Sequence, residues 1–591
     1  MKKRKAVIYH VFTRLFGNTN TTNKPWGTLE ENGVGKFADF TDKALSEIKN
    51  LGVTHIWYTG VPHHAVIRDY TAYGISNDDP RVVKGRAGSP YAVKDYYNVD
   101  PDMAENPANR LEEFIALIER SHAHQLKVII DIVPNHVARN YEGITNPEGI
   151  KGFGAEDDTS KTYTVDNNFY YNPSEAFRTP EWRDGYAPLG GENLENYPSL
   201  EEYPAKWTGN GSRSSQPDFN DWYETVKVNY GMHPDGHKDF DELPGHYYHE
   251  SYETHYHFWQ DRKVPNSWVK FKDIALYWID LGVDGFRYDM AEMVPVEFWS
   301  YMNSHIKMKN PDAFLMAEVY NPDQYRGYIY YGKMDYLYDK VEFYDSLKHI
   351  MKGYGWTDHM PVVQDNMQDI EHHMLHFLEN HDEQRIASPE FAGDAEKGRP
   401  AMVVSATMST SPTMIYFGQE VGEPAQENAG FGSPSRTSIF DYIGVPHHQR
   451  WVNNKQFDGG QLSDKEKALR DFYKRLLNFT INSSALMGSY REIHRYNREH
   501  TDNYNYKVLS FTRWDDDEKL LIISNFDDAL SYDFNLKIPS DVIAAWQLAE
   551  GTFVMKDQLY QDEEVSLHIA NGEGEVAIAI EPLASYIFKL Q

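Results

Sequence analysis

The sequence contains no cysteine among its 591 residues. Disulfide bonds, thiolate nucleophiles and cysteine-based zinc sites are therefore excluded. Basic residues are fewer than acidic ones: the sequence has 58 Lys and Arg and 89 Asp and Glu. The formal net charge is therefore -31. Such an acidic surface repels phosphate groups, so we expect neither a nucleic-acid partner nor an anionic membrane partner.

Long hydrophobic runs are also missing from the sequence. No stretch of about 18 consecutive apolar residues occurs, so we expect no membrane span. The chain begins with the basic residues 2–5 and continues into a short apolar segment that lacks the core of a signal peptide. We therefore expect a cytoplasmic protein, with an exported protein whose signal has been removed as the alternative. The sequence leaves the oligomeric state open, and we expect a monomer.

Aromatic residues, by contrast, are abundant. They make up 14% of the chain, with 42 Tyr and 13 Trp. Aromatic planes stack on the apolar faces of sugar rings, and they also fill large hydrophobic cores. The composition alone fits both a carbohydrate-binding surface and ordinary core packing.

Eight short apolar runs end in polar residues, and stretches with helical periodicity lie between them at 40–51, 111–126 and 267–281. The predicted strands are 7–12, 54–59, 128–133, 285–289, 314–319, 336–341, 375–378 and 414–417. Alternating strands and helices indicate a parallel sheet, and eight repeats predict an α/β fold that closes into a (β/α)8 TIM barrel.

The spacing of these runs predicts the domain organisation. A barrel allots about 31 residues to each strand-helix unit. Asp289 and Glu318 are 29 residues apart, whereas Asp131 and Asp289 are 158 apart. We therefore predict a barrel domain at 1–137 and 263–489, and an inserted domain after strand 3 at 138–262 that walls a cleft. Alternating apolar strands near the end of the chain predict a C-terminal antiparallel β-sandwich domain at 490–591.

Polar residues end four of the predicted strands, and the carboxyl ends of barrel strands converge on one rim. The residues at these ends are Asp131, Asn135 and His136, then Arg287 and Asp289, then Glu318, and finally His381 and Asp382. Converging carboxylates beside Arg and His, without cysteine or a metal-type His cluster, suit the cleavage of a glycosidic bond.

Arg287 and Asp289 are two residues apart, so both side chains leave the same face of their strand. An adjacent guanidinium would keep Asp289 ionised, which a nucleophile requires. Glu318 precedes an apolar residue and lies near other carboxylates, so a raised pKa and the role of general acid are expected for it. A structural ion pair is the alternative explanation for Arg287 and Asp289.

The four strand ends resemble, in the same order, the signature regions of the α-amylase family, glycoside hydrolase family 13. The resemblance implies that Asp289 is the nucleophile, Glu318 the general acid/base and Asp382 a third carboxylate that grips sugar hydroxyls. It also implies that the sugar at the cleaved bond is bound by three further residues: Arg287, His136 and His381.

Two further segments, 90–96 after strand 2 and 418–420 after strand 8, resemble those of the family. In the loop after strand 2, Tyr91 matches the tyrosine that stacks on the sugar ring. Ala92 stands where exo-acting α-glucosidases usually carry Asp, which favours an open cleft and internal attack. The segment 216–220 and Arg385 are similar to those of oligo-1,6-glucosidase relatives. Glu292 lies where many α-amylases have Lys-His after the nucleophile, so it is a candidate for shaping the acceptor subsites.

The resemblance also raises calcium as a structural cofactor. Asn135 matches a calcium ligand of many α-amylases. In those enzymes, oxygen donors from the inserted domain and a backbone carbonyl at the position of Met293 complete the coordination of the calcium ion. An oxygen-rich loop at 17–23 is either a weak calcium site or a plain polar turn. We expect no organic cofactor, and we interpret the His-rich stretch 246–257 as packing rather than a metal site.

The leading hypothesis from the sequence is a retaining glycoside hydrolase that cleaves internal α-1,4-glucosidic bonds of starch, glycogen or maltodextrins by double displacement. Its substrate and partner would be an α-glucan or a malto-oligosaccharide. One alternative is a neopullulanase, an α-1,6-glucosidase or a glucan transglycosylase on the same scaffold. Another is a glucan-binding relative without catalytic activity.

Overall fold

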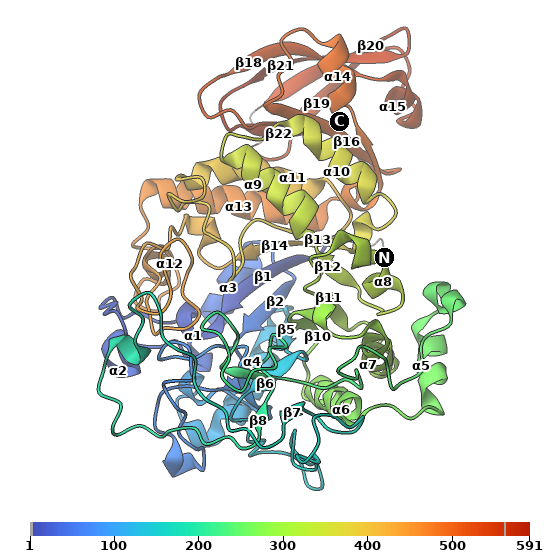
Figure 1. Ribbon diagram of the computed structural model, residues 1–591. Helices are drawn as coiled ribbons and strands as arrows, with labels where there is room; N and C mark the ends of the chain where they lie inside the picture. Colours follow the sequence, from blue (N-terminus) through green and yellow to red (C-terminus); the bar gives the residue numbers. More distant parts are fainter. Residues whose placement is uncertain (1–3, 561–562) are drawn as a thin grey trace.

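The computed structural model describes residues 4–560 and 563–591, so the first two residues of the basic stretch 2–5 lie outside the described part. Eight parallel strands form a closed barrel at its centre (Figure 1). In chain order they are β1 (Val7–Phe12), β2 (His55–Thr59), β5 (Lys127–Ile132), β10 (Gly285–Tyr288), β11 (Phe314–Ala317), β12 (Tyr336–Tyr338), β13 (Met374–Phe377) and β14 (Thr413–Tyr416). Because β14 pairs with β1, the predicted barrel and all eight of its strands are confirmed.

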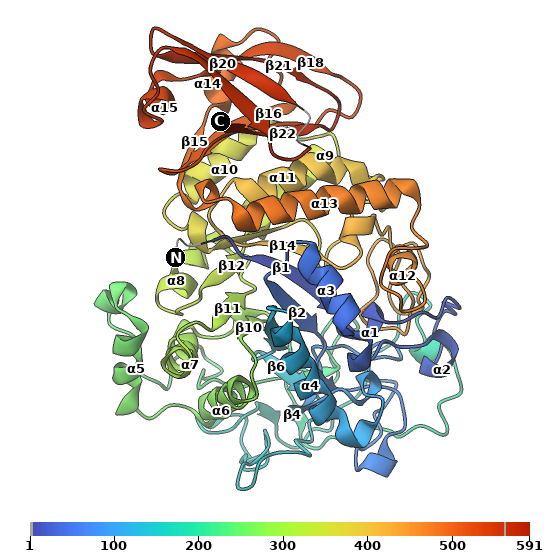
Figure 2. The ribbon, with the colours of Figure 1, turned by 180° about the vertical axis from the view of Figure 1, so that it is seen from behind.

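Helices follow the strands and surround the barrel (Figures 1 and 2). The longer ones are α3 (Asp42–Asn50), α4 (Arg110–Ala123), α6 (Asn266–Asp280), α7 (Val296–Lys309), α11 (Gly398–Thr407) and α13 (Asp464–Asn482). The shorter ones are α1 (Thr13–Phe16), α2 (Leu29–Asn32), α8 (Tyr325–Tyr330), α9 (Asp345–Met351), α10 (Met360–Asn366) and α12 (Pro446–Val452). The stripe of α6 that includes Trp268, Phe271 and Trp278 is fully buried, which explains why periodicity located this helix. Among the described residues, no helix is long and apolar enough to span a membrane.

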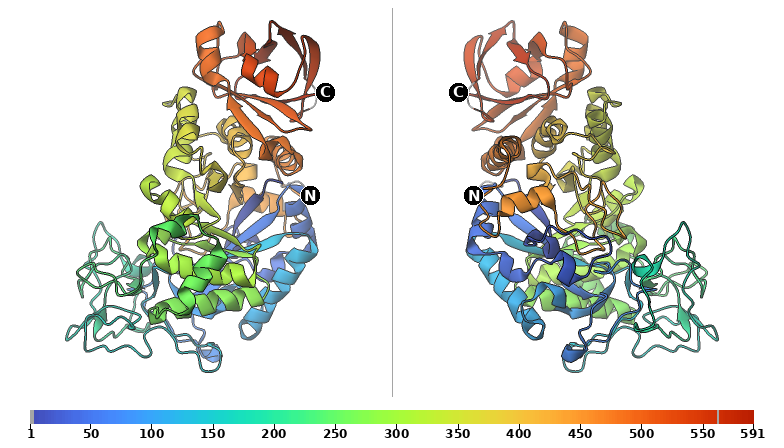
Figure 3. Two further views of the ribbon diagram at one scale, coloured as in Figure 1. Left: turned by 90° about the vertical axis from the view of Figure 1, so that its right-hand side faces the viewer. Right: turned by 90° about the vertical axis from the view of Figure 1, so that its left-hand side faces the viewer.

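Two long excursions leave the carboxyl ends of barrel strands. The loop after β2 contains β3 (Pro62–His64) and β4 (Val93–Val99), which pair antiparallel. The longer segment between β5 and α6, the inserted segment, contains β6 (His136–Ala138), β7 (Tyr171–Asn172), β8 (Ala205–Lys206), β9 (Thr225–Lys227) and α5 (Tyr252–Gln260). It projects from the side of the barrel and is mostly irregular (Figure 3). Its β9 pairs antiparallel with β6, and this register sets Lys227 opposite His136.

The C-terminal domain is an eight-stranded antiparallel sheet, which confirms the predicted β domain. The strand order is β15 (Ser489–Glu492), β16 (Val508–Trp514), β17 (Lys519–Asn525), β22 (Ser585–Leu590), β19 (Gly551–Asp557), β20 (Glu564–Ala570), β21 (Glu573–Ile580) and β18 (Tyr532–Ile538). Two helices, α14 (His494–His500) and α15 (Ser540–Ala545), pack on it. Because α14 contacts both β16 and β18, which lie near opposite ends of the strand order, one continuous sheet curls over itself (Figure 3).

The C-terminal sheet joins the barrel on the side away from the inserted segment (Figure 3). Apolar side chains of β16, β17 and β22, including Leu509, Phe511 and Ile522, belong to the same buried cluster as the barrel core. Strands β17 and β22 contact α11 directly. The C-terminal sheet therefore occupies a different part of the molecule from the two excursions, which lie at the carboxyl ends of the strands.

Candidate active site

Arg287 is the centre of a buried polar cluster at the carboxyl end of the barrel. Its side chain is fully buried. Nη1 donates to Oδ1 of Asp289 at 2.8 Å, and Nη2 donates to Oε2 of Glu318 at 3.0 Å. Asp131, opposite Arg287 in the register of β5 and β10, lies 3.5 Å from Nη1, and Nε donates to the hydroxyl of Tyr338 at 3.3 Å. One guanidinium therefore binds carboxylates at the ends of two neighbouring strands.

Glu318 follows β11 and is only 4% exposed. Its Oε2 also accepts a hydrogen bond from the backbone N–H of Met290 at 2.8 Å. Burial raises the pKa of the Glu318 carboxyl to about 7; the charge of Asp289 adds to this rise, and Arg287 opposes it. A carboxyl group with this pKa holds a proton on a large share of molecules at neutral pH, which is the state in which a general acid acts.

Asp289 lies directly after β10 and is also buried. Burial raises the pKa of its carboxyl above the ordinary value, the positive charge of Arg287 lowers it, and the charge of Asp382 raises it further. The sequence suggested that Arg287 keeps Asp289 ionised. In the structure the guanidinium limits the effect of burial on the Asp289 pKa without reversing it.

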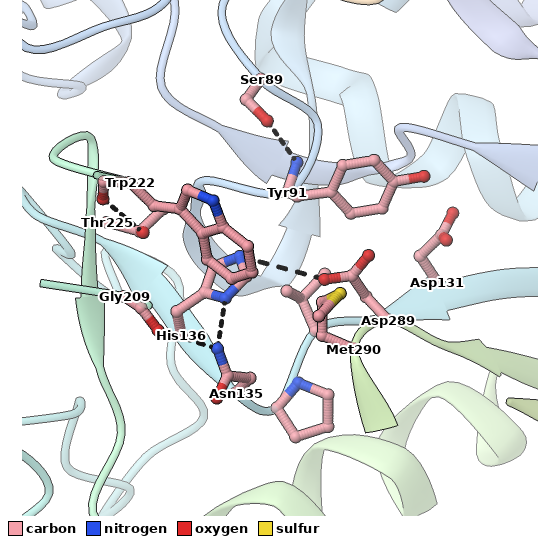
Figure 4. A network of polar contacts seen from close by, with 12 residues as sticks. Ser89, Tyr91, Asp131, Asn135, His136, Gly209, Trp222, Thr225, Asp289 and Met290 are labelled. Carbon is pink, nitrogen blue, oxygen red and sulfur yellow. Dashed lines mark hydrogen bonds and ion pairs between the residues drawn. The ribbon is translucent and has the colours of Figure 1, made fainter. Parts of the chain in front are cut away.

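His136 faces Asp289 from the start of β6, as Figure 4 shows. Its Nε2 lies 4.0 Å from Oδ2 of Asp289, and Nδ2 of Asn135 lies 3.0 Å from its Nδ1. Burial lowers the pKa of His136 to about 3, so the ring is neutral near pH 7. Because the amide nitrogen of Asn135 is a donor, Nδ1 is the acceptor, and we assign the ring proton to Nε2, which faces Asp289.

Tyr91, His381 and Asp382 form a second linked group of polar side chains in the site. The Tyr91 hydroxyl lies 2.7 Å from Nε2 of His381, which in turn lies 3.0 Å from Oδ2 of Asp382. The Asp382 side chain is 44% exposed and borders the cavity described below. Desolvation alone would raise the pKa of Asp382, but His381 and Arg287 outweigh it and lower the pKa to about 2. Asp382 is therefore ionised across the ordinary pH range.

Two residues that the sequence suggested as substrate contacts are directed elsewhere. Arg385 is fully buried, and its Nη1 donates to Oε2 of Glu379 at 2.9 Å. Glu292 accepts hydrogen bonds from the backbone N–H groups of Tyr320 and Asn321 at 2.9 and 3.0 Å, so it holds the loop after β11. Neither side chain lines the cavity in front of the carboxylates. Arg385 therefore belongs to an ion pair in the core, and Glu292 holds a loop in place.

A cavity of about 330 Å³ opens in front of the three carboxylates. Its volume falls in the range of about 300–1,000 Å³ that is typical of small-molecule sites. It is lined by Lys84, Ser89, Tyr91, His136, Trp222, Glu224, Asp289, Met290, Glu318, Tyr320, Lys340, Asp382, Glu383, Ile439 and Phe440. A larger hollow, of about 640 Å³, lies on the C-terminal domain beside β18 and β21, where none of the predicted site residues is found.

Sequence reasoning missed two ion pairs on the cavity wall. Lys84 and Glu224 lie 3.1 Å apart, and Lys340 and Glu383 lie 3.3 Å apart. Of these four residues, only Glu383 could have been suggested by the sequence, because it follows Asp382 directly. The other three lie in long loops or beyond a strand end, in patterns that surface residues also show.

The sequence model of the alpha amylase catalytic domain matches residues 10–467, and that of the alpha amylase C-terminal all-beta domain matches residues 499–591. The chain belongs to the alpha-amylase family. It is therefore a glycoside hydrolase, and its closed barrel and C-terminal sheet are the domains of that family.

Individual members of the alpha-amylase family match this chain at low identity. Alpha-amylase 3 of Dictyoglomus thermophilum is 22% identical over 563 residues, which cover 88% of this chain and 85% of that protein. A cyclomaltodextrinase of a Bacillus species is 20% identical over 559 residues, covering 89% and 73%. The solved structure of an α-amylase from Geobacillus thermoleovorans, complexed with acarbose, superposes with a TM-score of 0.59 at 17% identity, covering 99% and 98%. These matches establish the fold, whereas the activities named for the relatives differ.

The residues around Asn135 do not fit the calcium ion that the family resemblance raised. Nζ of Lys227 donates to Oδ1 of Asn135 and, at 3.2 Å, to the backbone carbonyl of Met293. A calcium ion takes six to eight oxygen ligands, so it would compete with this amine for both oxygens. Within the described ranges, three or more His, Asp or Glu side chains come close enough to share a metal ion only on a turn of the inserted segment, at His233, Asp235 and His237.

The oxygen-rich loop at 17–23 has the bonding of a polar turn. The side-chain oxygens of Asn18, Asn20 and Asn23 each accept a hydrogen bond from a backbone N–H group, at 3.1, 2.8 and 2.7 Å. These oxygens already have protein donors.

Proposed function

We propose that the protein is a retaining hydrolase of α-glucosidic bonds, in which Asp289 is the nucleophile and Glu318 the general acid and base. The observation that carries this proposal is that Arg287 donates to both carboxylates while the pKa of Glu318 is raised to about 7. Retaining glycosidases hold their two carboxyl groups about 5–5.5 Å apart, closer than inverting enzymes. A single guanidinium bonded to both groups supports the shorter spacing.

In the first step Asp289 attacks the anomeric carbon while Glu318 gives its proton to the glycosidic oxygen. The bond between the anomeric carbon and that oxygen breaks, the leaving sugar departs as an alcohol, and the other sugar is bound covalently to Asp289. In the second step Glu318, now a carboxylate, takes a proton from water, which attacks the same carbon and releases Asp289. The Nε2–H of His136 and the carboxylate of Asp382 bind hydroxyl groups of the reacting sugar.

We propose internal α-1,4 bonds of starch, glycogen or maltodextrins as the preferred substrate. Ala92, beside Tyr91, provides no charged group that could bind the end of a chain, which supports an open cleft. The α-amylases among the relatives agree with this substrate class.

A second candidate is an enzyme that prefers short or cyclic maltodextrins. The ion pair of Lys84 and Glu224 lines the cavity together with Tyr91 and His136, and a charged wall there would limit the number of sugar units bound on that side. A cyclomaltodextrinase among the relatives is compatible with this candidate.

A time course of products from amylose, pullulan and isomaltose separates the two candidates. Internal cleavage releases oligosaccharides of many lengths from amylose at the first time points and leaves isomaltose intact. Glucose or maltose as the sole early product from amylose would reject internal cleavage. In that case a K84M variant, which removes half of the charged wall, should lengthen the products, and K161M, at an exposed lysine of the inserted segment, is the matched control.

A further inference from the structure

We propose that the side-chain amine of Lys227 takes the place of a bound metal cation at the junction between the inserted segment and the barrel. Three segments meet at this amine. Lys227 lies on β9, Asn135 lies in the loop after β5, and Met293 lies in the turn after β10. The amine donates to an oxygen of each of the last two segments, so it links them as a shared cation would.

The surroundings of Lys227 are those of a built-in donor rather than a surface lysine. Its side chain is half-buried, and this burial lowers the pKa of the amine to about 7. Both of its acceptors are neutral oxygens, an amide and a backbone carbonyl. The charged amine has three N–H donors, and the neutral amine still has two, so both contacts are possible in either state. In the charged state the amine also repels an incoming metal ion.

The contact with Asn135 fixes the orientation of the His136 ring. Because an amine only donates in its charged form, it faces the oxygen of the Asn135 amide, and the amide nitrogen then faces Nδ1 of His136 at 3.0 Å. The backbone holds the amide in place, since Nδ2 also donates to the carbonyl of Gly209 at 2.9 Å. This order of donors leaves the ring proton on Nε2, the nitrogen nearest Asp289.

The contact with Met293 fixes the turn that follows Asp289. Met290, at the start of this turn, has a left-handed backbone with φ of 45°, and its N–H donates to Glu318. The N–H of Met293 donates back to the carbonyl of Met290 at 3.1 Å, so the two ends of the turn are coupled. Lys227 is therefore a positioning residue for both carboxylates, although it contacts neither of them.

Calcium binding and thermal unfolding test this proposal independently of the reaction. The melting temperature of the wild-type protein should be the same in EDTA and in millimolar calcium. K227M keeps the length of the side chain and removes its donors, so its melting temperature should be lower, and K161M should match the wild type. K227E places a carboxylate beside Asn135 and the carbonyl of Met293, so its melting temperature should be low in EDTA and should rise with calcium.

A positioning role also predicts a change in the pH profile. In K227M we expect kcat to fall by about 10- to 100-fold, the range for groups that orient residues around a metal site. The alkaline limb of kcat/KM should move to higher pH, because Glu318 loses stabilisation of its charged form by the N–H of Met290. An equal loss of activity without this shift would contradict the positioning role.

Two results would overturn the proposal as a whole. One is a K227M protein with the melting temperature of the wild type. The other is a wild-type protein that is destabilised by EDTA, with that response lost in N135A, because this would place calcium on Asn135. An EDTA response that persists in N135A would place the metal elsewhere and would leave the role of Lys227 standing.

Discussion

The raised pKa of Glu318 predicts how both the activity and the stability of the protein change with pH. Its rise from the ordinary value of 4.5 to about 7 corresponds to roughly 3 kcal/mol in favour of the protonated side chain, at about 1.36 kcal/mol per pKa unit. Cleavage requires protonated Glu318, so kcat/KM of the free enzyme should fall as the pH rises through about 7. With an unperturbed carboxyl group the decline would already begin near pH 4.5.

The raised pKa of Glu318 also determines the direction in which stability changes with pH. The folded protein holds the Glu318 proton more tightly than the unfolded chain, so this group stabilises the fold fully below pH 4.5 and the contribution is lost as the pH rises through about 7. E318Q cannot ionise, so it should be more stable than the wild type at pH 8, by up to about 3 kcal/mol. The difference should vanish near pH 4.

Urea unfolding of both proteins at pH 4, 6 and 8 measures the stability difference, and initial rates on a maltodextrin across the same range measure the activity. E318Q should lose about 100- to 10,000-fold in kcat on an ordinary glucoside, the usual contribution of a general acid, and much less on a substrate whose leaving group needs no proton. A wild-type alkaline limb below pH 5, or equal stability of the two proteins at pH 8, would refute the reasoning.

Three further substitutions test other parts of the site. Y91F removes the hydroxyl that contacts His381. The loss of one hydrogen bond, worth roughly 0.5–1.5 kcal/mol, should reduce kcat/KM by about 2- to 10-fold. An unchanged kcat/KM would show that this contact is dispensable. E292Q keeps an oxygen for the two backbone donors, so products from maltodextrin, separated by chromatography, should not change, and a new distribution would assign Glu292 to a sugar subsite. R385M leaves Glu379 buried without its Arg385 partner, so urea unfolding should show a loss of stability of about 3–5 kcal/mol. We expect the KM to be unchanged. A raised KM without loss of stability would instead assign Arg385 to substrate binding.

The barrel could be predicted from sequence because parallel barrel strands are covered on both sides and read as continuous apolar runs. The eight runs, from 7–12 to 414–417, all correspond to observed strands. Residues at the strand ends, such as Arg287 and Asp289, could be placed because the barrel fixes where those ends point. The curl of the C-terminal sheet could not be predicted, since alternation shows which residues face a core but not how far the sheet bends.

The long loops limited the prediction of the site. Lys84, Glu224 and Lys227 lie in segments without periodicity, so their sequence neighbourhood resembles that of solvent-exposed lysines and glutamates. Their surroundings depend on contacts over long sequence separations, such as that between Lys227 and Met293. Arg385 and Glu292 were suggested by position in a motif, and position alone does not determine the direction of a side chain.

The most direct test of the central claim is to trap the covalent intermediate. A fluorinated glucosyl fluoride, which slows the second step more than the first, should label the wild-type protein with one sugar, and mass spectrometry of the peptides should locate it on Asp289. D289N should remain unlabelled and should lose hydrolysis, and the anomer first released by the wild type should be α by NMR. A label on another residue, or a β-anomer as the first product, would contradict the account.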